Sequence, residues 1–554
     1  MKAPATDQKL RGGYYTPAQI ARFLADWAIT TSTETVLEPS CGDGNILAAA
    51  AEVLLERGMK PADIAQAVSG IEIDKVEASK ATTRLSCLGI PASSSIRVGD
   101  FFAYCEDHLL SGERFDAAIG NPPFIRYQSF LEVQRAIAFR LMKHAGMRPT
   151  RLMNAWVPFV VATTLLLNPH GGRLAMVVPA ELMQVSYTAE LRRFLVDSYS
   201  RITLITFRKL VFSDIQQEVV LLLGERDGKE HAGIRTIELT DLNDLSGFEH
   251  QEFAASQLKE MDHSSEKWTQ YYLDACELDL LRSLRTHPSL TPAQKVLGVD
   301  VGIVTGLNDF FVMSEEKAKA HNLLEYTIPI VTRSAHLPGI QFRQEDLIAN
   351  TAKQLPARLL TLPDVQRDQL PDAARNYILM GERLGSHQGY KCRIRKNWYV
   401  VPSIWVPDAF MLRQIHGFPK LILNLTEATS TDTIHRVRFD SKPLGQMIVA
   451  AFHNSLTFAS TEVMGRSYGG GVLELEPNEA DGLPLPLLNA DRLDIAYLST
   501  LALSGDIEAI LDITDRIHVV EGLGLSKQDV VRLRMVWHKL RNRRINRNHN
   551  TNEK

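Results

Sequence analysis

Residues 37–45 read Leu-Glu-Pro-Ser-Cys-Gly-Asp-Gly-Asn, a β-like run that passes into a turn with glycines at positions 42 and 44. This pattern predicts a strand that ends at Glu38 and a helix over residues 46–58. Glycine has no Cβ, so such a turn lets the backbone approach a ligand closely. A glycine turn after a strand is more often purely structural, so its meaning depends on the residues around it.

Short β-like runs alternate with helical patterns throughout residues 1–235. The predicted strands are 35–38, 68–73, 95–98, 115–119, 173–178, 202–207 and 218–223. Strands that alternate with helices predict an α/β fold, a doubly wound Rossmann-like parallel sheet whose ligands bind at the carboxyl ends of the strands.

The ends of the next two predicted strands carry acidic side chains. Glu72 ends the second strand, where a carboxylate can accept both hydroxyls of a ribose. Asp100 ends the third, where it could accept a proton of an adenine amino group, and Phe101 could pack on the ring. Together with Gly42 and Gly44, these strand ends predict a site for an adenosine-containing cofactor.

The fourth strand is followed by Asn121-Pro122-Pro123-Phe124. Two consecutive prolines remove two backbone donors and stiffen the chain, so the Asn amide and the aromatic ring are held at fixed relative positions. The Asn121 side-chain oxygen and the Pro122 carbonyl can accept both protons of a planar amine, while Phe124 stacks on the ring that carries it. The segment therefore predicts chemistry at an exocyclic or amide nitrogen.

The composition limits the class of protein. The chain has 554 residues, a net charge of −4, 45% hydrophobic and 23% charged residues, which is typical of an ordinary globular protein. Its five cysteines form no CxxC pair and indicate reduced thiols in a cytoplasmic protein, without a disulfide frame or a metal site. The longest apolar stretch, 156–167, is too short for a bilayer, so we expect no membrane span.

The near-neutral net charge hides two basic stretches. Residues 531–554 carry eight Lys or Arg and one acid, and residues 391–420 carry six Lys or Arg with Asp408 as the only acid. The second stretch is interleaved with aromatic residues, a combination that suits a surface for nucleic acid. A solvated charged face explains each stretch equally well.

The motifs resemble those of the γ-class S-adenosylmethionine-dependent DNA adenine-N6 methyltransferases of restriction–modification systems. In that class a Tyr-Thr-Pro motif comes first, then the cofactor glycines, then Asn-Pro-Pro-aromatic, then a target-recognition domain, and this chain has the same order. Matching segments are Gly13-Tyr14-Tyr15-Thr16-Pro17, Leu210-Val211-Phe212, the run 301–308 as the start of the recognition domain, and 467–474 with 483–486 as its close. Phe124 stands where Tyr is commoner in the class.

The resemblance implies a class I methyltransferase domain over residues 1–235, a connecting segment 236–290, an α/β target-recognition domain 291–490, and terminal helices with a basic tail over 491–554. A break in these helices is predicted at 521–524 by two glycines.

The resemblance also implies S-adenosylmethionine as cofactor and a role for each motif residue. The residues implied to bind the cofactor are Tyr15, Thr16, Pro17, Glu38, Pro39, Cys41, Gly42, Gly44, Glu72, Ile73, Asp100, Phe101 and Asn121. Those implied to act in catalysis are Asn121, Pro122, Pro123 and Phe124. Phe124 and Phe212 are implied to lie on the two faces of the target base, which must be flipped out of the duplex.

The same motifs are compatible with other functions. Methylation of cytosine C5 is disfavoured because the chain has no Pro-Cys pair. N4-cytosine methylation uses the same amine chemistry, and enzymes acting on RNA or on protein glutamine share the Asn-Pro-Pro-aromatic motif. A DNA-binding specificity subunit fits poorly with intact cofactor and catalytic segments, and no nuclease cluster is evident.

We expect double-stranded DNA as partner, a possible separate restriction endonuclease, and a monomer. Candidate DNA contacts within the recognition region are Lys391, Arg393, Arg395, Lys396, Trp398 and Arg466, with Ser467 beside the last. The recognition sequence cannot be read from the chain.

Overall fold

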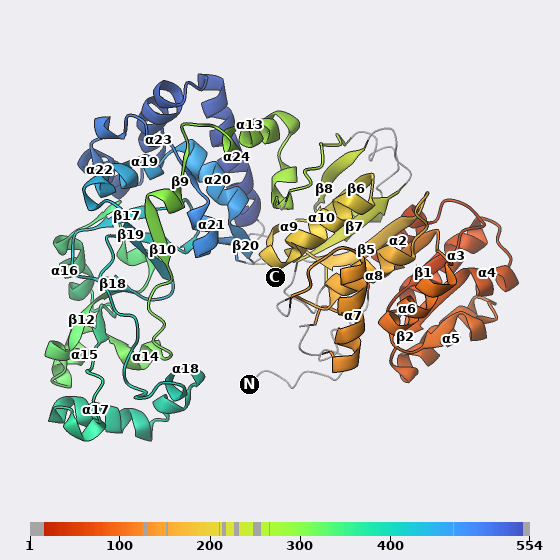
Figure 1. Ribbon diagram of the computed structural model, residues 1–554, viewed down its shortest axis with the longest axis horizontal. Helices are drawn as coiled ribbons and strands as arrows, with labels where there is room; N and C mark the ends of the chain where they lie inside the picture. The colour runs from red at the N-terminus through yellow and green to blue at the C-terminus, as the bar shows by residue number, and fades with distance from the viewer. Residues whose placement is uncertain are drawn as a thin grey trace. The chain divides into compact units, whose positions relative to one another are not determined.

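The computed structural model describes residues 16–125, 130–150, 153–209, 211–212, 218–226, 232–246, 256–264, 266–468 and 470–546. The chain divides into two compact units, Met1–Tyr272 and Leu273–Lys554 (Figure 1). Their boundary falls within the segment 236–290 that was expected to connect two domains, whereas strand β8 runs through residue 235.

The first unit is built on an eight-stranded sheet in the order β3-β2-β1-β4-β5-β7-β6-β8. Its strands are β1 (Val36–Glu38), β2 (Val68–Glu72), β3 (Ile96–Val98), β4 (Ala117–Gly120), β5 (Arg173–Pro179), β6 (Arg201–Phe207), β7 (Val219–Glu225) and β8 (Gly233–Leu239). All seven predicted strands are present, each within two residues of its predicted bounds, and β8 adds an edge strand that the sequence did not reveal.

The sheet is mixed, so the prediction of an all-parallel sheet was wrong for one strand. β7 pairs antiparallel with both β5 and β6. Only residues 208–218 separate β6 from β7. A parallel connection needs a crossover of a dozen or more residues, so this short connection returns the chain in the opposite direction.

Helices cover both faces of this sheet, as a doubly wound fold requires. They are α2 (Ala18–Ala28), α3 (Asn45–Glu56), α4 (Pro61–Ala67), α5 (Lys75–Cys87), α6 (Phe101–Ser111), α7 (Glu132–His144), α8 (Trp156–Leu166), α9 (Glu181–Gln184), α10 (Ala189–Ser198) and α11 (Leu242–Ser246). Ala175 and Val177 of β5 join one core with α2, α3 and α4. Leu174 and Met176 are equally buried, and because side chains alternate along a strand they face the other side.

The second unit contains a five-stranded sheet, β10-β19-β15-β17-β13, and a four-stranded sheet, β11-β14-β12-β18, with two smaller pairings. The strands are β9 (Thr291–Pro292), β10 (Leu297–Asp300), β11 (Val312–Met313), β12 (Thr327–Val331), β13 (Gln341–Phe342), β14 (Arg358–Leu360), β15 (Ala409–Leu412), β16 (Gln414–Ile415), β17 (Leu421–Asn424), β18 (Thr429–Ser430), β19 (Ile434–Phe439), β20 (Arg466–Tyr468), β21 (Val472–Glu474) and β22 (Pro484–Leu485). Short strands with many connections agree with the predicted irregular α/β module.

Two groups of helices lie at opposite ends of this unit (Figure 1). α14 (Asn308–Phe311), α15 (Glu315–Ala320), α17 (Asp372–Arg383) and α18 (Tyr390–Arg393) surround one core cluster. At the other end lie α19 (Gly445–Phe452), α20 (Ser455–Met464), α22 (Ile495–Ser504), α23 (Ile507–Thr514) and α24 (Lys527–Asn546). The remaining helices are α13 (Ala275–Arg285), α16 (Gln344–Ala352) and α21 (Pro477–Asp481).

The predicted terminal helices and their break are confirmed. A π-helix, Asp515–Gly522, continues α23, and α24 begins only after residues 523–526. No helix in the described part of the chain is both long enough and apolar enough to span a bilayer.

Candidate active site

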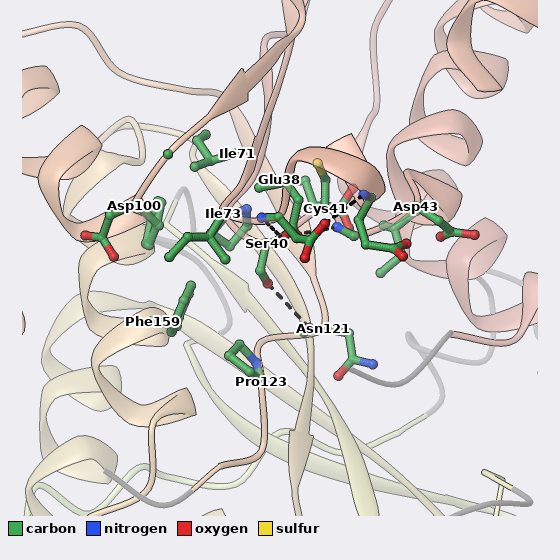
Figure 2. Close-up of a pocket in the computed structure, with 18 of the residues that line it drawn as sticks. Glu38, Ser40, Cys41, Asp43, Ile71, Ile73, Asp100, Asn121, Pro123 and Phe159 are labelled. Atoms are coloured by element: carbon green, nitrogen blue, oxygen red, sulfur yellow. Dashed lines mark hydrogen bonds between the residues drawn. The ribbon is translucent and has the colours of Figure 1, made fainter. Parts of the chain in front are cut away.

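A cavity of about 750 Å³ opens at the carboxyl ends of β1, β2 and β4. The predicted site residues that line it are Thr16, Glu38, Pro39, Cys41, Gly42, Glu72, Ile73, Asp100, Phe101, Asn121 and Pro123. Asp43 lies toward one end of the lining and Asp100 with Phe159 toward the other, and Asn121 and Pro123 lie along one side (Figure 2). Tyr15 lies outside the described residues.

The glycine turn after β1 shapes one wall of the cavity. Gly42 has φ +52°, and a Cβ added to it would meet no atom within 4 Å. Gly44 has φ +80°, and its Cβ would lie 2.7 Å from the Cβ of Ala81 on α5. Gly44 therefore permits α5 to pack against the turn, whereas Gly42 leaves room on the cavity side.

Glu72, at the end of β2, is held in place by the backbone. Its Oε2 accepts a hydrogen bond from the Gly42 N–H at 2.9 Å, and its Oε1 accepts one from the Asp74 N–H at 2.8 Å. Burial raises the pKa of the carboxyl, and these two N–H donors oppose that rise. Each oxygen keeps a second lone pair, so Glu72 can still accept hydroxyl protons from a ligand.

Glu38, at the end of β1, is the most unusual group of the site. It is 2% exposed, and its Oε2 has no hydrogen-bond partner among the described residues. Burial, with the charges of Asp43 and Glu72, raises its pKa well above the ordinary value. Asp43 is paired with Arg84 at 2.5 Å. A buried carboxylate oxygen without a donor is a place for a cation from outside the protein.

The far end of the cavity has an aromatic floor and a fixed carboxylate. Asp100 caps α6 by accepting from the Ala103 N–H at 3.0 Å, and its second oxygen accepts from Gln134 Nε2 at 2.7 Å. Phe101 stacks on Phe159 with ring centroids 5.3 Å apart. Gln134 and Phe159 line the cavity, but the sequence did not single them out because both lie in helical runs that read as ordinary helix positions.

The Asn-Pro-Pro-Phe segment is fixed by its neighbours. Asn121 Nδ2 donates to Thr16 Oγ1 at 3.2 Å, and the Thr16 carbonyl accepts from Asn45 at 2.7 Å. A Cβ on Gly120 would lie 3.2 Å from the Pro39 ring, so the two strand ends approach closely. The start of α2, the turn after β1 and the end of β4 thus meet at Asn121.

The two aromatic residues implied to face a base lie at the edge of the core. Phe124 is half-buried and packs against the core cluster that contains Phe212, which is 6% exposed. Neither lines the cavity, and neither do Pro17, Gly44 and Pro122. The base-facing roles of Phe124 and Phe212 stay predictions.

The segment after Phe124 is anchored to the start of α8, which a polar cluster that sequence reasoning missed ties to α9. The Ile125 carbonyl accepts from the Ala155 N–H at 2.9 Å. Asn154 donates to Glu181 at 2.9 Å and to the Tyr187 hydroxyl at 3.1 Å, and that hydroxyl in turn donates to Glu181. The cluster is made of single polar residues from separate parts of the chain, so no sequence motif could have identified it.

The candidate DNA contacts of the second unit fall into two groups. Lys391, Arg393 and Lys396 are exposed. The others make internal contacts: Arg395 donates to the Val304 carbonyl, Trp398 donates to Glu382, and Arg466 pairs with Glu479 at 2.8 Å.

The basic stretch of α24 is also internal in large part. Arg544 pairs with Glu462, Arg534 pairs with Asp515 and Asp512, and Lys539 pairs with Glu277. Arg547 and Lys554 lie outside the described residues.

Comparison with known proteins places both units. Residues 1–276 match the family model N-6 DNA Methylase, and residues 265–519 match Type II methyltransferase M.Eco57I, C-terminal domain. Type II methyltransferase M.XamI of Xanthomonas campestris pv. amaranthicola is 25% identical over 490 residues, which are 86% of this chain and 85% of that protein. Type II methyltransferase M.AccI of Acinetobacter calcoaceticus is 21% identical over 503 residues, 86% of each protein.

Among solved structures, the DrdV–DNA complex, determined by cryoEM, aligns with this chain at a TM-score of 0.50 and 11% identity. The alignment covers 81% of this chain and 54% of that chain, so the chain spans about half of its length. At this identity the likeness is one of fold alone.

Proposed function

The chain belongs to the N-6 DNA methylase family, as an adenine-specific DNA methyltransferase of the Type II restriction–modification kind, and we propose that its cavity binds S-adenosylmethionine and that Asn121–Phe124 hold the target adenine. The family uses S-adenosylmethionine as methyl donor. This assignment selects adenine N6 among the alternatives that the Asn-Pro-Pro-aromatic motif left open.

The residues of the cavity fit this cofactor from end to end. Glu38 offers its unpartnered oxygen to the ammonium group of the methionine end. Glu72, fixed by two backbone donors, accepts from the ribose hydroxyls. Asp100 accepts from the adenine amino group in place of Gln134, and Ile73, which is 57% exposed beside the cavity, packs on the ring. Bound there, the cofactor supplies an electrophilic methyl group on its sulfonium sulfur.

The chain contributes positioning at the target nitrogen. The Asn121 side-chain oxygen and the Pro122 carbonyl accept the two N6 protons of an adenine flipped out of the duplex. These hydrogen bonds draw the nitrogen lone pair out of conjugation with the ring and toward the methyl group. Orientation in a closed site and fixed dipoles account for the acceleration.

One observation carries the proposal. A single cavity is lined both by Glu38, a buried carboxylate with an unpartnered oxygen, and by Asn121, whose side chain is fixed through Thr16. A cation-binding end and an amine-binding end therefore share one cavity, as transfer from a sulfonium to an amine requires.

The test is methyl transfer to genomic DNA. Purified protein is incubated with DNA and labelled S-adenosylmethionine, and modified bases are mapped by single-molecule sequencing. We expect N6-methyladenine within one sequence context, none with Asn121→Ala, and wild-type transfer with the matched control Asn243→Ala, an exposed residue of α11. Cofactor binding by Asn121→Ala should persist, and its loss in parallel with transfer would contradict the role given to Asn121.

We further propose that the modifying chain acts beside a separate restriction endonuclease, since M.XamI and M.AccI, each matched along most of its length, are named Type II methyltransferases.

A further inference from the structure

The chain around α18 in the second unit is strongly basic. Residues 383–407 contain five Lys or Arg and no acid. Within this stretch α18 is a short helix, Tyr390–Arg393, continued by Ile394 in helical conformation. Neither the family assignment nor the cavity accounts for it.

α18 is seated firmly on the loop 301–308. Gly306 has φ +86°, and a Cβ on it would lie 2.9 Å from the Cβ of Lys391 and 3.2 Å from the sulfur of Cys392, which is fully buried. Arg395 donates to the Val304 carbonyl at 3.0 Å and its guanidinium lies 5.8 Å from the centre of the Phe311 ring. A residue larger than glycine at 306 would push the helix away, so α18 is presented as a fixed element.

The solvent-exposed face of α18 combines large apolar side chains with lysine and arginine side chains. Tyr390 is 65% exposed and Ile394 is 60% exposed, and their spacing of four residues places them on one side of the helix. Lys391, Arg393 and Lys396 are exposed beside them, and no carboxylate pairs with these three in the described part of the chain.

The nearest acid in sequence does not neutralise this face. Glu382 accepts from the Trp398 indole at 3.2 Å and pairs with Arg367 at 2.8 Å, so its charge is already compensated. Lysine and arginine side chains without a carboxylate partner can bind phosphates, and the exposed aromatic and aliphatic side chains between them can pack against stacked nucleobases. The surface therefore complements a double-stranded nucleic acid.

We propose that α18 binds duplex DNA, with Lys391, Arg393 and Lys396 on backbone phosphates and with Tyr390 and Ile394 inserted against the base stack. The proposal rests on the proposed function, because the duplex is the substrate. It replaces Arg395, Trp398 and Arg466 as DNA contacts and assigns them to holding the unit together. Inserted apolar side chains unstack a base step, which lowers the work of flipping the target adenine.

The phosphate contacts are tested by the salt dependence of DNA binding to the full chain. The logarithm of the affinity for a short duplex falls with the logarithm of salt concentration by about 0.9 per phosphate contact. Each of Lys391→Ala, Arg393→Ala and Lys396→Ala should lower that slope by about 0.9 and weaken binding several-fold. Lys319→Ala, an exposed lysine of the same unit that pairs with Glu315, is the matched control. Slopes equal to that of the control would overturn the phosphate assignment.

The insertion is tested by rescue with a weakened base pair. Tyr390→Ala and Ile394→Ala should lower kcat/KM about tenfold on a matched duplex, and a duplex with the target adenine mispaired should restore most of the rate, because flipping then costs less. Tyr390→Phe keeps the ring and should behave as wild type. An equal loss on both duplexes, or no loss, would overturn the insertion.

The two proposals fail separately. If the wild-type chain forms no N6-methyladenine, the proposed function fails while the salt slopes still report on α18. If transfer is normal and the slopes do not change, only the inference about α18 fails.

Discussion

Two buried glutamates of this chain are in opposite situations. The Glu462 side chain on α20 is 2% exposed, and both its oxygens accept hydrogen bonds from Arg544 of α24, at 2.9 and 2.7 Å. Glu38 as a whole residue is 2% exposed, against 5% for the whole of Glu462, yet its Oε2 has no partner among the described residues. Its charged neighbours Asp43 and Glu72 are themselves acids.

The two carboxyls differ in whether the fold itself supplies a cation, which indicates a structural role for Glu462 and a ligand-binding role for Glu38. Burial raises the pKa of both carboxyls, but Arg544 opposes the rise at Glu462, whereas Asp43 and Glu72 add to it at Glu38. Taking a carboxylate out of water costs several kcal/mol unless a partner offsets it. Glu462 is compensated within the fold and holds two helices together. Glu38 lines a cavity and is compensated only when a cation enters.

The largest effect should come from breaking the paired glutamate. Arg544→Ala leaves Glu462 buried without a cation and should lower stability by about 3–5 kcal/mol. Arg544 also donates to the carbonyls of Ile415 and Gly471, at 3.2 and 2.6 Å. Scanning calorimetry of the full chain should show the second unit unfolding at a lower temperature. The double variant Glu462→Gln, Arg544→Met should recover much of the loss, and failure to do so would mean that the carbonyl contacts dominate.

The unpaired glutamate should respond in the opposite sense. On folding at neutral pH the Glu38 carboxyl must either take up a proton or bury its charge, so Glu38→Gln should stabilise the cofactor-free protein. The same change loses a charge-assisted hydrogen bond worth about 1.5–3 kcal/mol, so the Kd for S-adenosylmethionine should rise about 10- to 100-fold. Thermal shift and titration calorimetry on one preparation measure both. A variant that is less stable and binds as wild type would reverse the comparison.

Glu38 should also couple cofactor binding to pH. Its pKa is raised in the cofactor-free protein, which favours the protonated carboxyl, whereas pairing with an ammonium favours the ionised form. Binding should then release a fraction of a proton that grows as this pKa rises further above the pH, and affinity should rise with pH, by at most tenfold per unit, until the pH exceeds that raised pKa.

The same linkage makes the stability of the cofactor-free protein depend on pH. Because the pKa of Glu38 is higher in the folded state, its contribution to stability is complete below the unfolded-state pKa and is lost as pH rises through the folded-state pKa. Titration calorimetry in buffers of different ionisation enthalpy counts the protons that cofactor binding releases. If the wild type and Glu38→Gln release equal numbers of protons, a group other than Glu38 titrates.

The sequence predicted the residues around Glu38 because they follow a general rule. Strand ends of a parallel sheet meet at one edge, so Glu38, Glu72 and Asp100 could be placed together from their positions after β-like runs. Gln134 and Phe159 could not, because residues on helices reach the cavity through packing that no local pattern records.

The basic stretches show the complementary limit of sequence reasoning. A charge count treats Arg544 and Lys391 alike, yet Arg544 meets an acid 82 residues away in sequence and Lys391 meets none among the described residues. Whether a basic residue forms an ion pair depends on tertiary contacts. Composition alone therefore could not distinguish a structural arginine from a lysine that is available to contact DNA. Strand β7 was predicted, but its direction was wrong, although the connection of residues 208–218 before it is too short for a parallel crossover.

The smallest effects should come from the Asp43–Arg84 ion pair beside Glu38. Substituting the acid and substituting the arginine should change proton release and cofactor affinity in opposite directions. Asp43 raises the pKa of Glu38 and is itself paired with Arg84. Asp43→Asn removes one negative neighbour, so Glu38 should hold its proton less tightly and binding should release a smaller fraction of a proton. The cationic cofactor also loses an attraction, which should raise its Kd about threefold, within the range of a partly exposed charge pair.

Arg84→Gln leaves Asp43 uncompensated and should shift proton release the other way, with a slightly lower Kd. Because the two substitutions touch the same ion pair, any shared effect on folding changes both variants in the same direction, whereas the electrostatic effect on Glu38 separates them. Titration calorimetry at two ionic strengths should show the separation shrink with salt, since part of this pair faces water. Equal shifts in both variants would mean that Glu38 responds to the local fold and not to the charges around it.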